Sequence, residues 1–125
     1  MATRQALTEI SRRSETDNTA SQYHICEQGA TAGEVDICNG AGDVPTGVFQ
    51  NAPDTDQAAR VATAGVTQVI AGAAVSVGNL VGTNASGRAI LKSSDGDWII
   101  GQALTAASAN GEEISVQMNI MQLTV

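Results

Sequence analysis

EISVQMNIMQLTV, residues 113–125, is the stretch that decides the fold class. Its apolar side chains stand at positions 114, 116, 118 and 120, and then at 121, 123 and 125. A period of two is typical of a β-strand with one buried face. The period shifts by one between Ile120 and Met121, which predicts a β-bulge or a strand that changes sheets.

Short strands and turns fill the chain before this segment. Patterns of apolar and β-forming residues predict strands at 22–27, 34–38, 47–50, 59–63, 66–70, 79–82, 88–91 and 97–100. Ser93-Ser94-Asp95-Gly96 predicts a hairpin turn between the last two of these. The Ala-rich segment 103–109 is too short for a stable helix. The sequence therefore predicts an all-β fold, a small β-barrel or β-sandwich of short antiparallel strands.

Two similar halves are one interpretation of this pattern. Residues 29–35 resemble 72–80, and residues 47–52 resemble 101–106. In each half a loop then leads to an alternating strand, near Val61 and near Val116. The alternative is chance similarity, because any β chain rich in Gly, Ala and Val aligns with itself.

Residues 1–19 stand apart as an extended N-terminal arm, and residues 20–125 form the predicted barrel or sandwich domain. Residues 12–19 are polar without an apolar period, which is typical of an arm or linker. Ala6–Ile10 carries a few apolar anchors and is a candidate short strand or docking segment. The alternative is a frayed terminus.

The charge is acidic and unevenly placed. Six basic residues face thirteen acidic ones, a formal charge of −7. Acidic residues balance Arg4, Arg12 and Arg13 within the arm, so the net charge lies beyond residue 19. We expect no nucleic-acid partner, because phosphate binding needs a basic face. We also expect no membrane partner, because no apolar run approaches the ~20 residues of a span.

The composition also indicates how much apolar area the core can bury and in which cell compartment the protein is made. Ala, Val and Ile supply most of the apolar stock, and there are only three aromatic residues. Such a core buries little apolar area per residue, so we expect further burial against copies of the chain or a larger surface. The first residues lack the apolar core of a signal peptide. We therefore expect synthesis in a cytoplasm, with both cysteines reduced.

The candidate catalytic and metal-binding residues lack the partner residues that such sites need. His24 and Cys26 share a strand face, with Cys38 further on, but neither a protease signature nor close zinc-ligand spacing accompanies them. Asp95-Gly96-Asp97 echoes a calcium loop without the remaining ligands, so a solvated turn is favoured. We expect no catalytic residue, cofactor or metal site, and hence no enzyme.

Lys92 and Trp98 each allow two interpretations. Lys92 lies near a hairpin, as in biotin or lipoate carrier domains, but without their flanking residues, so a surface lysine is the default. Trp98 favours a core or subunit interface over a ligand site.

The second half of the chain resembles the small capsid decoration, or cement, proteins of tailed bacteriophages. The resemblance rests on VIAGAAVSVGNLV (69–81), GRA (87–89) and IGQALTAASANGEEISV (100–116). It implies a β-barrel or β-sandwich on the outer capsid surface, often trimeric, that cements neighbouring major capsid protein subunits.

A virion protein made in the cytoplasm of a bacterial host follows from this resemblance. The predicted partners are the major capsid protein and further copies in a homotrimer. The candidate capsid contacts lie in the arm: apolar Leu7 and Ile10, and basic Arg4, Arg12 and Arg13. The alternatives are a glycan- or receptor-binding β module of a phage head fibre, and a carrier domain with Lys92 modified.

Overall fold

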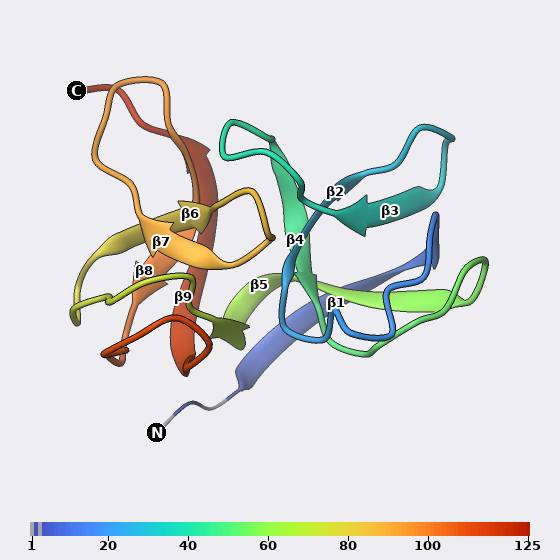
Figure 1. Cartoon of the computed structure of the whole chain (residues 1–125), viewed down its shortest axis with the longest axis horizontal. Coiled ribbons are helices and arrows are strands. Elements are labelled where there is room, and N and C mark those ends of the chain that lie inside the picture. Colours follow the sequence, from blue (N-terminus) through green and yellow to red (C-terminus); the bar gives the residue numbers. More distant parts are fainter. Residues whose placement is uncertain (1, 3) are drawn as a thin grey trace.

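The described part of the chain folds into nine β-strands, arranged as Figure 1 shows. The computed structural model describes residue 2 and residues 4–125, so residues 1 and 3 of the predicted arm lie outside it. No helix occurs among the described residues, which confirms the all-β prediction. The described residues therefore contain no helix that could cross a membrane. The strands are β1 (Gln5–Ser14), β2 (Ile25–Gln28), β3 (Glu34–Ile37), β4 (Pro45–Phe49), β5 (Ala58–Ile70), β6 (Leu80–Thr83), β7 (Ala89–Leu91), β8 (Trp98–Ala103) and β9 (Glu113–Gln122).

Each predicted segment contains a strand, but some ends are shifted: β2 begins at Ile25 and not at residue 22, and β9 ends at Gln122. The segments expected at 59–63 and 66–70 are a single strand, β5, which continues through Gly65. The predicted irregularity of the last strand is present as a β-bulge. Between the pairs Ile99–Met121 and Gly101–Met118, β8 advances by two residues and β9 by three, so β9 carries the extra residue of the bulge.

The first unit is a closed ring of five strands. Its order is β1-β3-β2-β4-β5, and β1 closes the ring by pairing with β5. The β1–β3 pair is parallel, at Arg13–Glu34 and Ser14–Val35, and the other pairs are antiparallel. We call β1–β4 together with residues 58–62 the first unit.

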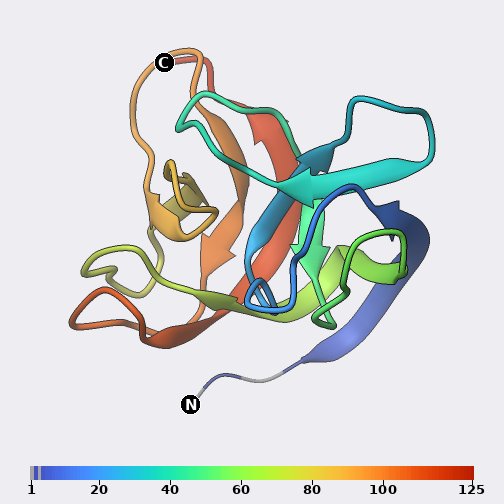
Figure 2. The same ribbon diagram turned by 45° about the vertical axis from the view of Figure 1, so that its right-hand side comes forward.

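The second unit continues from the far end of β5, in the order β5-β9-β8-β6-β7. Residues 66–70 of β5 pair with β9, and a parallel bridge from Ala71 to Ala89 brings β7 back beside the end of β5. Figures 1 and 2 show the two units side by side, with β5 passing from one to the other. We call residues 66–122 the second unit.

The two units repeat one pattern of strand pairing. In the first, β2 pairs with β3 and β4, and β4 pairs with β5. In the second, β6 pairs with β7 and β8, and β8 pairs with β9. The first strand of each unit also matches. In the first unit β1 is antiparallel to β5 and parallel to β3, and in the second the end of β5 is antiparallel to β9 and forms a parallel bridge to β7. The prediction of two similar halves is therefore confirmed.

Glycines mark the repeat at equivalent places. A Cβ on Gly47 would overlap the carbonyl oxygen of Ala62 in the next strand, and a Cβ on Gly101 would overlap that of Gln117. The proposed alignment of residues 47–52 with 101–106 therefore has the right register. The other alignment, of 29–35 with 72–80, is wrong, because the turn from β2 to β3 corresponds to the turn from β6 to β7.

The residues that the structure describes form two hydrophobic clusters. The smaller one is the interior of the first unit: Cys26, Val35, Phe49, Ala59 and Val61. The larger one combines the interior of the second unit, such as Val81, Ile114 and Val116, with first-unit residues such as Ile25 and Val48. The second unit therefore packs its own core and also covers one outer face of the first.

The predicted arm contains strand β1. Its side chains are mostly exposed, apart from the buried Ser14 and the half-buried Leu7, Ile10 and Arg12. The candidate short strand at Ala6–Ile10 is thus part of β1, paired with β5. A division into an arm, 1–19, and a separate domain, 20–125, stays a prediction.

Candidate functional site

The five predicted contact residues lie on or beside β1, but they do not share one face. Leu7 packs against the larger hydrophobic cluster and Ile10 against the smaller one. Arg12 is half-buried and donates to the Ser11 carbonyl oxygen, at 3.0 Å. These three side chains are reachable by a partner only in part while β1 stays paired.

Arg4 and Arg13 are the exposed members of the set. The Arg4 guanidinium lies 5.9 Å from the centre of the Tyr23 ring, within the range of a cation–π contact. Arg13 contacts Glu34 at 2.9 Å and Asp56 at 3.6 Å. Half of the Arg13 side chain remains exposed, so it can still meet an external carboxylate.

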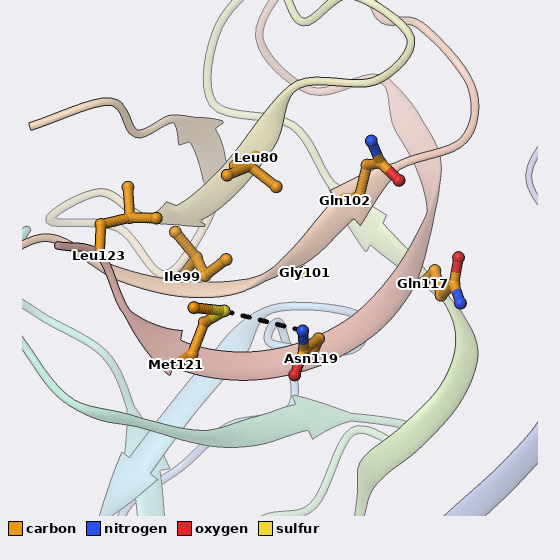
Figure 3. A pocket seen from close by; sticks show the side chains of 8 residues that line it. All are labelled: Leu80, Ile99, Gly101, Gln102, Gln117, Asn119, Met121 and Leu123. Atoms are coloured by element: carbon orange, nitrogen blue, oxygen red, sulfur yellow. Dashed lines mark hydrogen bonds between the residues drawn. The ribbon is translucent and has the colours of Figure 1, made fainter. Parts of the chain in front are cut away.

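The second unit carries a groove that sequence reasoning missed (Figure 3). It is about 270 Å³ in volume and is lined by residues of β6, β8 and β9 and of the segment after β9: Leu80, Ile99, Gly101, Gln102, Gln117, Asn119, Met121 and Leu123. Figure 3 shows the apolar side chains toward one end of the groove and Gln102 and Gln117 at the other; the apolar ones are Leu80, Ile99, Met121 and Leu123. None of the lining residues is charged.

His24 is buried and has a lowered pKa. Its Nδ1 lies 3.1 Å from the Gln22 carbonyl oxygen, and its Nε2 lies 3.3 Å from Nε of Arg88, which donates to it. Burial lowers the pKa of His24, and the Arg88 charge lowers it further. Both ring nitrogens are therefore engaged within the chain.

The cysteines are buried and free. Burial raises the pKa of Cys38 to about 12 and raises that of Cys26 further. Because the thiolate is the reactive form, both thiols are inert at neutral pH. Buried free cysteines of this kind pack as small apolar side chains.

Glu27 and Asp43 form a carboxyl pair beside Cys38, and one ligand atom from each of the three lies within 4.8 Å of the others. Burial, and then the hydrogen bond to Asp43 and its charge, raise the pKa of Glu27 to about 7. The same hydrogen bond lowers the pKa of Asp43, which also accepts from the backbone N–H groups of Asn39 and Gly40. The arrangement fits two carboxyl groups that share a proton beside a protonated thiol.

Lys92 is buried, so the expectation of a surface lysine is wrong. Its Nζ donates to the Ala41 carbonyl oxygen at 2.8 Å, which ties the second unit to the loop between β3 and β4. Carrier domains need a projecting lysine, and Lys92 does not project. Trp98 is half-buried in β8, opposite Gln122 of β9.

The Asp95-Gly96-Asp97 segment is a hydrogen-bonded turn. Asp97 accepts from the backbone N–H of Ser94 at 3.0 Å, and Asp95 accepts from that of Val125 at 3.1 Å. The two carboxylates thus bind separate backbone groups, which is common for Asp side chains in turns.

Comparison with known proteins gives one family and one fold. The family model described as "phage cement protein" matches residues 16–118. A solved structure, the head fiber gp8.5 N base of bacteriophage phi29, superposes with a TM-score of 0.70 at 19% identity, covering 95% of this chain and 99% of that one. No curated protein sequence matches the chain. At this identity the structural likeness concerns the fold.

Proposed function

Because the chain belongs to the phage cement protein family, we propose that it binds the outer surface of a phage capsid and cements neighbouring major capsid protein subunits. The observation that carries this proposal is the family match over residues 16–118, which spans most of both units. We place the protein on the virion, made in the host cytoplasm and assembled as a homotrimer, with no catalytic role and with no nucleic acid or membrane as partner.

Cementing follows from simple thermodynamics. A protein that binds the assembled shell but not its free subunits stabilises the shell by mass action, by about 2.7 kcal/mol per site at a concentration 100 times Kd. A copy that touches two subunits must also release one of them before they separate. No chemical step is required of the protein.

The arm supplies the candidate contacts in this proposal. Arg4 and Arg13 are exposed and available to capsid carboxylates while β1 stays paired. Leu7 and Ile10 pack against the two hydrophobic clusters and Arg12 is half-buried, so these three side chains offer a partner only part of their surface while β1 stays paired with β5. The family match begins at residue 16, so β1 precedes the matched region.

Co-sedimentation with capsids that lack the protein tests the proposal. We expect the full chain to sediment with such capsids and a chain with Arg4→Ala and Arg13→Ala to bind more weakly, since two charge contacts are gone. The matched control is Ser86→Glu with Ser94→Glu, which changes the net charge equally at exposed turns of the second unit.

The outcomes separate the capsid role from the arm's part in it. A full chain that stays in the supernatant contradicts the capsid role. Equal binding by the arginine variant and the control assigns the contacts to the barrel instead. Deletion of residues 1–19 is a harsher test, because it also removes a strand from the first unit.

A second function is favoured by the structural likeness. The similar solved structure is the base of a head fibre. A glycan- or receptor-binding module of such a fibre would also sit on the head, but it would present its binding face outward. Binding to a glycan array without any effect on capsid stability would favour this second function.

A further inference from the structure

One row of residues is buried in the first unit, while the matching row is open in the second. Strand register pairs Ile25 with Val48 and Val48 with Ala62. The same positions of the second unit are Leu80, Gln102 and Gln117, paired in the same way. Each row lies on the outer side of its sheet, because the alternate residues, such as Phe49 and Ala103, fill the interior.

The second unit itself covers the first row. Ile25, Val48 and Ala62 are fully buried and belong to the larger cluster together with second-unit residues. The backbone N–H of Ile25 donates to the Gly87 carbonyl oxygen at 2.7 Å, which joins β2 to the turn between β6 and β7. In this chain, then, the outer face of one unit is a packing surface for the next.

The matching row of the second unit forms part of the groove. Leu80 is half-buried, and Gln102 and Gln117 are exposed. Beside them lie Met121, which is 42% exposed, and Leu123 (Figure 3). Within the described part of the chain, no third unit covers this face.

The lack of charge in the groove is compatible with a second copy of the chain as occupant. Each chain carries a formal charge of −7, so two copies repel wherever carboxylates face each other. The groove is lined by apolar and amide side chains alone. Amide side chains are neutral, so they can hydrogen-bond to polar groups of a neighbour without adding electrostatic repulsion. This face is therefore compatible with a partner of like charge.

We propose that this groove is the surface through which one copy of the chain packs against a second copy. The inference deepens the proposed trimer by assigning its contact. Within the chain, the outer face of a unit meets a different surface of the next unit. The corresponding contact between copies is therefore head-to-tail, the kind that closes into a ring when the rotation allows.

Sedimentation of two matched variants, without any capsid, tests the proposal. Met121→Glu places a carboxylate in the groove, and Leu104→Glu places one at an equally exposed apolar residue, 41% exposed, outside the groove. At high micromolar concentration we expect wild type and Leu104→Glu to sediment as oligomers. We expect Met121→Glu to fall to the 12.7 kDa of a single chain.

Gln117→Glu keeps the test valid if Met121→Glu alters the fold, because the Gln117 side chain is exposed and the change preserves its size. Unaltered circular dichroism with a loss of oligomer supports the proposal for either variant. A wild-type chain that remains a single copy overturns it, as does equal dissociation of the Leu104 variant. None of these outcomes depends on capsid binding, so co-sedimentation still judges the proposed function separately.

Discussion

Equivalent faces of the two units have different side chains. Ile25, Val48 and Ala62 lie where the second unit covers them, and Leu80, Gln102 and Gln117 occupy the same pairing positions on the uncovered unit. The inner faces differ less, since apolar residues fill both interiors. The two units therefore share one strand topology. They differ mainly in the side chains of the outer face, which are apolar where another unit covers them and include two amides where none does.

Substitution of the equivalent glycines should give the largest effect. In Gly101→Val the new side chain meets the Gln117 backbone, and in Gly47→Val it meets that of Ala62. Because a backbone carbonyl inside a sheet cannot move aside, we expect each to cost about 3 kcal/mol or more. Urea unfolding measures this, with Gly42→Ala as an unstrained control that has open space around it. Little loss in either variant would contradict the structural equivalence of the units.

Exchange of residues between the two rows should give an intermediate effect. Val48→Gln places an amide in the covered row, and a buried amide without partners costs about 2 kcal/mol. Gln102→Val makes the reverse change on the open face and should alter the free energy of unfolding by less than about 0.5 kcal/mol. The same chemical unfolding experiment compares them. Equal losses would mean that the two faces are covered to the same extent.

The carboxyl pair of the first unit should give the smallest effect. Glu27 has a pKa of about 7 in the folded chain against an ordinary value of 4.5. Between these values the folded state holds a proton that the unfolded state has lost, so stability falls as the pH rises from 4.5 to 7.

Glu27→Gln should remove this decline, because the amide donates a hydrogen bond to Asp43 as the protonated acid does. Solvent screens the half-exposed carboxyl, so the gain above pH 7 should be about 1 kcal/mol or less. Thermal unfolding between pH 4.5 and 8 measures it. An unchanged slope in the variant would show that Glu27 does not titrate in this window.

Local patterns predicted the strands well. Alternation at 113–125 indicated both β9 and its bulge, since a period of two and its interruption are properties of one strand. The Gly47–Gly101 correspondence was also visible. Lys92 was placed wrongly because its partner, the Ala41 carbonyl, lies 51 residues away in the chain.

The groove was not predictable for a similar reason. Its lining comes from three strands and the segment after β9, and exposed amides on any one strand look like an ordinary solvated face. Pairing of β1 with β5 was equally hidden, because most side chains of β1 are polar or exposed. What joins distant strands is backbone hydrogen bonding, which leaves little trace in side-chain composition.

The heat stability of capsids tests the cementing role most directly. The protein is added in increasing amounts, up to saturation, to capsids prepared without it. The temperature at which the shell opens is then measured by calorimetry or by the release of packaged DNA. If the protein cements the shell, we expect the opening temperature to rise with protein concentration until the sites are full, as binding to the assembled shell alone requires. A protein that sediments with capsids yet leaves the opening temperature unchanged at saturation would contradict it.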